Sequence, residues 1–303
     1  MKKNYKLLAT LVLSGLAGAA FGVLPAEAAV TVGSADGTEK SLTNTEFTSL
    51  YGNKYTDSTS GNTVSISGEG TVTLKGETVS SGGSSYTAST LAGAYTLESG
   101  DASNNKLSVT DGASVSFSNA TSSLEIAGGI SMKGAASGNQ VTLSGVSLNL
   151  PDATTSSLEI AGGVASASAS GNTVTLSNST AQSSYIYGGY GYIKYYGDTS
   201  AEADAVAGVN HNTVTLTNTS ASGTRVYGGY MEYYVAPTIA TFLNDSSNTV
   251  EISNTAEKKY GVSTEESTET DTSTEADPIS TSASSNSVTI TGSQVEGVYG
   301  GVG

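Results

Sequence analysis

The stretch "SGNTVTLSNSTAQSSYIYGGY" at residues 170–190 decides the fold, because it contains two short motifs that recur along the chain. The first motif is an Asn followed by alternating polar and apolar residues, here Asn172 to Leu176. The second is an apolar pair followed by Gly-Gly and another apolar residue, here Tyr185 to Tyr190. Alternation of apolar and polar residues is typical of half-buried strands, so each motif predicts one strand.

Both motifs repeat in alternation over most of the sequence. The asparagine motif begins at Asn62, Asn105, Asn139, Asn172, Asn212, Asn248 and Asn286, with a first step of 43 residues and later steps of 33 to 40. The glycine motif occurs at residues 124–130, 158–164, 185–190, 225–230 and 297–302, with "LAGAY" (91–95) and "KKYGV" (258–262) as degenerate copies. A period of this length predicts a repeat architecture.

The residue types suggest how each strand begins and ends. We expect Gly-Gly to end its strand by taking a positive φ at a tight bend. We expect the leading Asn either to tolerate left-handed geometry as the chain turns, or to form a side-chain ladder between repeats. The pair Tyr187 and Tyr190 recurs as Tyr227 and Tyr230, which predicts stacked rings from one repeat to the next.

The strand pattern predicts an all-β fold, a repetitive parallel β-helix or β-solenoid. No apolar spacing typical of helices extends over a useful length of the mature chain. One repeat cannot bury its apolar side alone, whereas stacked repeats form a continuous narrow core. A propeller is the alternative, because its blades have a similar period. A propeller requires four antiparallel strands per blade, and the sequence indicates two strong strands per repeat with room for a third.

The two ends of the chain differ from the repeats. Three lysines precede an apolar stretch at residues 7–23, and Ala26-Glu27-Ala28 fits a cleavage site, which predicts a signal peptide over residues 1–28. A retained anchor helix is the alternative. Residues 29–60 fit the repeat poorly and predict an N-terminal cap. We expect repeats over 61–303, ending within a repeat and leaving an open edge.

An acidic segment interrupts the late repeats. Residues 263–285 are rich in Thr, Ser and Glu and have no apolar periodicity. Such a segment buries too little apolar surface to offset its ordering entropy, so it predicts a disordered loop. A linker between two domains is the rival interpretation, although the asparagine motif resumes at Asn286.

The composition excludes several classes of partner. The chain has 12 basic and 27 acidic residues, with a formal net charge of −15. Without residues 1–28 it has 9 basic and 26 acidic residues, a net charge of −17. This charge argues against binding to nucleic acid or to anionic lipid headgroups, both of which need Lys and Arg. Since Cys is absent, stability cannot come from disulfides and must come from an extended repetitive core.

The sequence resembles the passenger regions of autotransporters, the type V secreted proteins. The features that carry this resemblance are the leader, the acidic chain without Cys, and the repeats "SGNTVTLSNSTAQSSYIYGGY" and "NHNTVTLTNTSASGTRVYGGY". The resemblance covers the whole chain. It implies a right-handed β-helix displayed at the surface of a diderm bacterium. In that family a C-terminal membrane β-barrel carries the passenger across the outer membrane. No barrel is present in this sequence, so we expect any membrane attachment to depend on a barrel outside it.

Few residues in the sequence suggest catalysis or metal binding. Glu125 and Glu159 occupy the same place in successive glycine motifs, and paired carboxylates suit glycoside hydrolysis. We interpret them instead as exposed strand positions. His211, the single histidine, precedes a repeat strand where other copies have Gly or Ser, so we interpret it as a turn residue. The sequence predicts no catalytic residue, no metal site and no cofactor.

Additional tyrosines follow two of the glycine motifs, at Tyr192, Tyr195, Tyr196, Tyr233 and Tyr234. These residues lie beyond the repeated pattern, at the base of the longer insertions. Aromatic rings stack on sugars, so we predict that these five tyrosines form a contact surface.

The sequence therefore predicts a secreted or surface-displayed passenger without enzymatic activity, an adhesin or structural stalk that presents loops for multivalent contact. Its expected partners are glycans or proteins of host or bacterial surfaces. The alternatives are a β-helical polysaccharide-degrading enzyme similar to pectate lyases, and a truncated fragment without function.

Overall fold

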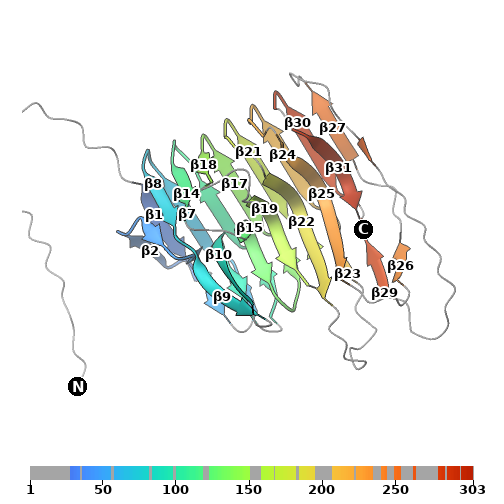
Figure 1. The fold of residues 1–303 in the computed structure, drawn as a ribbon, viewed down its shortest axis with the longest axis horizontal. Helices are drawn as coiled ribbons and strands as arrows, with labels where there is room; N and C mark the ends of the chain where they lie inside the picture. Colours follow the sequence, from blue (N-terminus) through green and yellow to red (C-terminus); the bar gives the residue numbers. More distant parts are fainter. Residues whose placement is uncertain are drawn as a thin grey trace, which may run out of the picture.

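The computed structural model describes residues 28–302, apart from 35, 56–57, 82–83, 98–99, 119–122, 151–157, 167, 182–183, 195–206, 222, 235–239, 244–248, 254–261, 264–278, 284 and 294. The described residues form an all-β fold and contain no helix. Figure 1 shows the strands of neighbouring repeats side by side, with the colours running from blue to yellow across the central repeats. The predicted signal peptide and most of the acidic segment 263–285 lie outside the described residues.

Five sheets contain the strands, and most neighbouring strands within them are parallel. In order across the sheet, sheet A contains β2 (Glu39–Leu42), β1 (Ala29–Gly33), β7 (Thr63–Ser67), β13 (Lys106–Val109), β17 (Gln140–Ser144), β21 (Thr173–Ser177), β24 (Thr213–Thr217), β30 (Ser287–Thr291) and β27 (Thr249–Ser253). Sheet B contains β18 (Ser147–Asn149), β14 (Ser114–Phe117), β8 (Thr71–Leu74) and β3 (Glu46–Phe47).

Sheet C is the widest of the remaining sheets. It contains β28 (Val262–Ser263), β31 (Gly297–Val302), β25 (Arg225–Tyr234), β22 (Ser184–Lys194), β19 (Leu158–Ala165), β15 (Ser123–Ser131), β10 (Ser84–Ala92) and β4 (Leu50–Tyr51), with β11 (Tyr95–Thr96), β5 (Lys54–Tyr55) and β9 (Glu77–Ser81) beside this path. Sheet D contains β20 (Ala169–Ser170), β16 (Ala136–Ser137), β12 (Ala102–Ser103) and β6 (Thr59–Ser60). Sheet E contains β23 (Ala207–Gly208), β29 (Ile279–Ser282) and β26 (Ala240–Leu243).

Each central repeat visits the sheets in the order D, A, B, C, for example through β16, β17, β18 and β19. A repeat therefore contributes up to four strand positions, more than the two or three that the sequence indicates. Equivalent strands of successive repeats pair in parallel, as when Val141 lies opposite Val174. The antiparallel four-stranded blades of a propeller do not occur among the described residues.

The main hydrophobic core lies between the strands of sheets A, B and C. Apolar residues from alternate strand positions are fully buried, as in β21, where Val174 and Leu176 have no exposed surface. Each central repeat adds an equivalent layer of Val, Leu and Ile to this core. The alternation in the asparagine motif thus has the predicted role.

The predicted asparagine ladder is confirmed. The Oδ1 atom of Asn172 accepts hydrogen bonds from the backbone N and the Nδ2 of Asn139, both at 3.0 Å. Asn172 donates in the same way to Oδ1 of Asn212, also at 3.0 Å from both atoms. The same pair of bonds links each of the asparagines in the order Asn62, Asn105, Asn139, Asn172, Asn212 and Asn286. Asn248 lies outside the described residues.

The expectation that the asparagine itself adopts the left-handed conformation is wrong. The residue before each asparagine adopts it instead. Positive φ angles occur at Gly61, Asn104, Gly138, Gly171, His211 and Ser285. The Asn that follows points inward and is buried, because its amide is needed for the ladder. His211 has a φ of 57° and is exposed, so the structure places it in the turn where the sequence predicts it.

The expectation for Gly-Gly is wrong. The strand continues through the glycines, as β15 does across Gly128 and Gly129, and neither glycine has a positive φ. A Cβ on Gly129 would lie 2.5 Å from Oδ1 of Asn139. A Cβ on Gly128 would overlap the carbonyl oxygen of Gly162 and lie 2.7 Å from the backbone N of Gln140. Glycine is required here because two chain segments meet at backbone distance beside the asparagine ladder.

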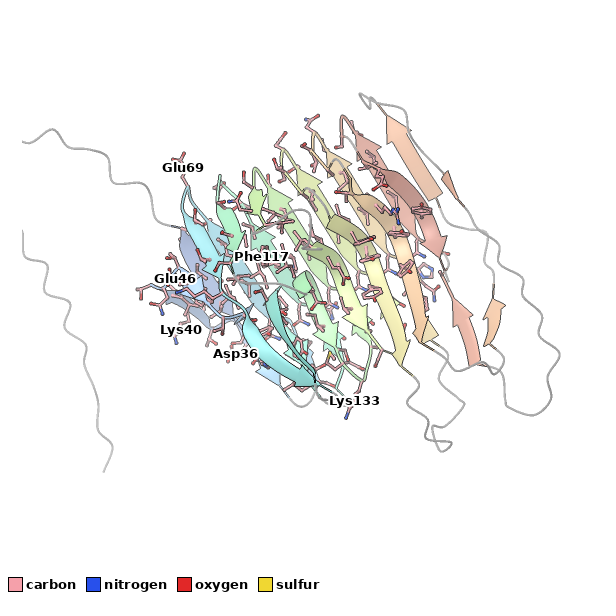
Figure 2. All side chains as sticks on the ribbon, viewed as in Figure 1. Asp36, Lys40, Glu46, Glu69, Phe117 and Lys133 are labelled. Carbon is pink, nitrogen blue, oxygen red and sulfur yellow. The ribbon has the colours of Figure 1, made fainter. Side chains whose placement is uncertain are left out.

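The region 29–60 has two parts. β1 pairs antiparallel with β2 and with β7, so this hairpin covers one edge of sheet A. The short strands β3, β4, β5 and β6 instead pair in parallel with the following repeat. Figure 2 shows the labelled side chains Asp36, Lys40 and Glu46 at this end of the stack.

Candidate contact surface and carboxylate pair

The glycine-motif strands of sheet C have a second apolar face opposite the main core. Ile186 is part of the main core, while its neighbours Tyr185 and Tyr187 belong to a separate cluster. Successive side chains of a strand point to opposite faces, which accounts for this division. The second cluster contains small aliphatic residues in the central repeats, such as Ala127 and Ala161, and tyrosines in the late ones.

We call the late part of this face the tyrosine cluster, which consists of Tyr185, Tyr187, Tyr190, Tyr227, Tyr230 and Tyr299. Tyr187 lies in register with Tyr227, and their ring centroids are 5.3 Å apart. Tyr227 stacks in turn on Tyr299, at 4.6 Å and an interplanar angle of 10°. Tyr190 and Tyr230 form a second stacked pair at 5.9 Å. The predicted stacking between repeats is therefore confirmed.

The inner rings of the cluster are buried by the outer ones. Tyr187 and Tyr227 are 5% and 8% exposed, whereas Tyr185, Tyr190, Tyr230 and Tyr299 are only partly buried. Burial raises the pKa of Tyr227 to about 12, and burial together with the nearby Glu159 carboxylate also raises the pKa of Tyr187. Both phenols therefore stay neutral across the physiological range, and their rings are available for apolar stacking.

Three of the five tyrosines that the sequence singled out lie on the strands that carry this cluster. Tyr192 lies in β22, and Tyr233 and Tyr234 lie in β25, where the backbone pairs Ile193 with Tyr233. The side chains of these three residues lie outside the described part of the structure. Tyr195 and Tyr196 are outside the described residues altogether.

A smaller aromatic group at the start of the same face was missed by the sequence analysis. Tyr51 and Tyr95 have ring centroids 5.3 Å apart, and the Nζ of Lys54 lies 5.1 Å and 5.5 Å from the two rings. A cation over aromatic faces is favourable. The segments "LYGNKY" (50–55) and "LAGAYT" (91–96) are weak copies of the glycine motif, and the register of β4 against β10 shows that both are in phase.

Glu125 and Glu159 are brought together by the register. They lie directly opposite each other on β15 and β19, and both are partly buried. Burial, and secondarily the Glu159 carboxylate, raise the pKa of Glu125 to about 8. Since neighbouring strands are about 4.8 Å apart, one of the two carboxyl groups holds a proton near neutral pH. The interpretation of both residues as exposed strand positions is therefore wrong, because both are partly buried.

The next residues in this column are Tyr185 on β22 and Arg225 on β25. Arg225 is exposed and forms an ion pair with Glu296, with Nη2 and Oε1 3.6 Å apart. An exposed pair of this kind contributes little to stability. Among the described residues, no group of three or more acidic or histidine side chains that could hold a metal ion was found.

Comparisons with family models, with curated proteins and with solved structures found no match. In the part of the chain that the structure describes, no helix is long and apolar enough to span a membrane.

Proposed function

We propose that this chain is a secreted or surface-displayed β-solenoid without enzymatic activity, an adhesin or structural stalk similar to autotransporter passengers. The observation that supports it best is the in-register parallel pairing of equivalent strands, for example of β15, β19, β22 and β25. A stack in which each repeat contacts only its neighbours grows along one axis and keeps its cross-section. Such a body projects its surface features away from the point where it is held.

The asparagine ladder gives this stalk its stiffness. Its amides are buried, and the Nδ2 of Asn139 also donates to the carbonyl of Ala102 at 2.9 Å, so both of its protons are used. A fully satisfied buried network of polar groups resists local opening, because any opened bond leaves an unpaired group in the interior.

Contact with a partner would come from the tyrosine cluster and the tyrosines beyond it. The partly buried rings of Tyr190, Tyr230 and Tyr299 offer apolar faces with hydroxyl tips. Faces of this kind suit surface glycans or proteins, and repetition along the stack makes weak contacts additive through multivalency. The net negative charge argues against nucleic acid as the partner.

The shape can be tested by small-angle scattering on the purified chain. A solenoid stalk should give a radius of gyration and a pair-distance distribution typical of a rod. A compact sphere, near ~19 Å for a domain of this length, would contradict the solenoid. Export can be tested separately by expressing the gene with its leader, because N-terminal sequencing of the exported product should begin at Ala29.

Binding can be tested with the chain immobilised on beads against arrays of surface glycans and intact cells. Binding that is lost in Tyr190→Ala/Tyr230→Ala and retained in Thr142→Ala would support the adhesin. If the chain is rod-shaped but binds none of the probes, only the role as a structural stalk remains. The tyrosine cluster would then be rejected as a contact surface.

A polysaccharide-degrading enzyme is the second candidate, favoured by the carboxyl pair alone. Glu125 with a raised pKa beside Glu159 provides a proton donor next to a carboxylate, which glycoside hydrolysis requires. Release of reducing ends from pectin-type or host glycans, abolished by Glu159→Gln, would favour this function. Absence of cleavage by the intact chain would reject it.

A further inference from the structure

Arg225 is exposed at the edge of the tyrosine cluster, and its neighbour on β22 is Tyr185. On its other side is β31, which lies between β25 and β28 instead of at the open edge that the sequence predicts. This order places Gly297 opposite Arg225. Two residues later, Tyr299 lies opposite Tyr227. Arg225 therefore lies between two strands that carry tyrosines of the cluster.

The ring of Tyr299 fills the space that a side chain at residue 297 would occupy. A Cβ on Gly297 would lie 3.2 Å from Cε2 and 3.3 Å from Oη of this ring. Because Gly297 is the residue opposite Arg225, the ring lies beside the arginine. The phenols of Tyr185, Tyr227 and Tyr299 all interact electrostatically with the charge of the guanidinium. One cation and two partly exposed rings, those of Tyr185 and Tyr299, therefore lie together on this face.

Glu296 adds an acceptor to this group. Its Oε1 is 3.6 Å from Nη2 of Arg225, and the side chains of Arg225 and Glu296 are 46% and 53% exposed. A direct charge-assisted hydrogen bond between such groups is about 2.7–2.9 Å long, so this pair is looser. The backbone holds the glutamate in place, because its N donates to the carbonyl of Thr224 at 2.7 Å. Since neither charged group is buried, their remaining donors and acceptors are open to a ligand.

A neutral sugar matches this arrangement. Each sugar hydroxyl donates and accepts hydrogen bonds, whereas the guanidinium only donates and the carboxylate only accepts. Two neighbouring hydroxyls can therefore bridge Arg225 and Glu296, while the apolar face of the sugar packs on the ring of Tyr299. An acidic sugar fits less well, because its carboxylate would meet that of Glu296 on a chain with a net charge of −15.

We propose that Arg225, Glu296 and Tyr299 form a subsite for a neutral hexose at the end of a surface glycan. The inference rests on the contact role proposed above for the tyrosine cluster and specifies its ligand. Arg225 donates to one sugar hydroxyl, Glu296 accepts from the next one, and Tyr299 stacks on the sugar. The charge of Glu296 also excludes sialic and uronic acids, which is specificity by repulsion.

The full chain can be tested on an array of hexose-terminated glycans, each displayed beside the same glycan capped with sialic acid. We expect the neutral glycans to bind about tenfold more strongly than their capped counterparts, because only the capped ones bring a second carboxylate to Glu296. This comparison needs no variant, so it does not depend on how a substitution affects folding.

Two variants test the roles of the charged groups. Arg225→Gln should weaken binding to the neutral glycans about tenfold, because it removes a charged donor. Glu296→Gln keeps the size but removes the charge, so the capped glycans should then bind as well as the neutral ones. Lys75→Gln is the matched control, since Lys75 forms an exposed ion pair with Glu46 outside the tyrosine cluster. Exposed pairs contribute little to stability, so all three variants should melt like the wild type.

Stronger binding to the capped glycans, or unchanged neutral binding in Arg225→Gln, would overturn the subsite and leave the adhesin proposal intact. Binding to cells or to surface proteins, together with no binding to any glycan, would have the same meaning. If neither glycans nor cells bind the chain, the contact function of the tyrosine cluster fails as well, and only the stalk remains.

Discussion

Two neighbouring columns of residues on the strands of sheet C follow opposite rules. The column that contains Gly128 and Gly188 is glycine in every described repeat that accepts a neighbour. The column one residue earlier varies, with alanine at Ala127 and Ala161 and tyrosine at Tyr187 and Tyr227. Both columns belong to the same strands and share the same backbone pairing.

The difference shows which contacts the fold requires. The glycine column meets backbone atoms, which cannot move without breaking the strand pairing. The variable column packs against other side chains, as Tyr187 does against Tyr190 of its own strand and Tyr227 of the next repeat, so a change at one position can be matched by a change at another. Substitutions in the two columns should therefore have very different costs, and the following predictions are ordered by expected size.

The largest effect is expected for Gly188→Val. Its branched side chain would overlap the carbonyl oxygen of Gly228 and would also meet Cβ of Asn212. We expect a loss of more than about 4 kcal/mol in the free energy of unfolding, or a failure to fold, measured by urea denaturation with circular dichroism. Ala161→Gly, a substitution in the variable column, is the control. If Gly188→Val were as stable as this control, the two columns would not differ in the cost of substitution.

A smaller loss is expected for Asn172→Ala, which interrupts the buried ladder. The N and Nδ2 of Asn139 lose their acceptor. Oδ1 of Asn212 loses the Nδ2 donor and keeps only the backbone N of residue 172. Leaving these groups unpaired should cost about 2–4 kcal/mol in the same measurement. Asn178→Gly is the matched control, because Asn178 is exposed at a φ of 50° and should tolerate glycine. Equal losses in both variants would mean that the ladder adds nothing.

In the variable column, Tyr187→Ala reproduces the residue found in earlier repeats. It removes stacking on Tyr190 at 4.9 Å and on Tyr227 at 5.3 Å. The expected loss is about 1–3 kcal/mol, with a reduced near-ultraviolet dichroism of the remaining tyrosines. A loss as large as that of Gly188→Val would remove the distinction between the two columns.

The smallest effect, expected for Glu125→Gln, depends on pH. The pKa of Glu125 is raised in the folded state, so the protonated form is favoured on folding and stability falls as the pH rises from about 4.5 to about 8. Gln keeps the neutral shape at every pH. The variant should match the wild type near pH 4.5 and be about 1–2 kcal/mol more stable at pH 8. Parallel pH profiles for the two proteins would contradict a raised pKa of Glu125 in the folded state.

The sequence allowed the parallel repeat, the asparagine ladder and the stacked tyrosines to be predicted, because each depends on a residue type at a fixed phase. It did not reveal the role of Gly-Gly, since the same glycines serve either for a positive φ or for close approach. The distinction lies in the backbone of Gln140, a dozen residues after Gly128. A Cβ on Gly228 would likewise overlap the carbonyl oxygen of Gly300, which lies even further away in the sequence.

The carboxyl pair illustrates a different limit. Glu125 and Glu159 share a place in the motif, which predicts that they are in register, and the structure confirms this. Their burial could not be predicted from either residue, because it depends on the second apolar face of sheet C. The signal for that face was the alanine, isoleucine and valine on either side of Gly-Gly. It was not recognised because Gly-Gly itself was expected to form a bend.

The asparagine ladder also gives the stack an electrical polarity. From Asn62 to Asn212 each described amide donates to the asparagine of the later repeat, so these side-chain dipoles align head to tail and polarise one another. The first acceptor, Oδ1 of Asn62, accepts a hydrogen bond from Nδ2 of Asn53 at 3.2 Å. In the register of the strands, Asn53 lies opposite Ala94, and glycine follows at this position from Gly129 onward. The two ends of the molecule are thus chemically unlike. Two copies that met through identical ends would bring donor to donor or acceptor to acceptor at the centre of the junction.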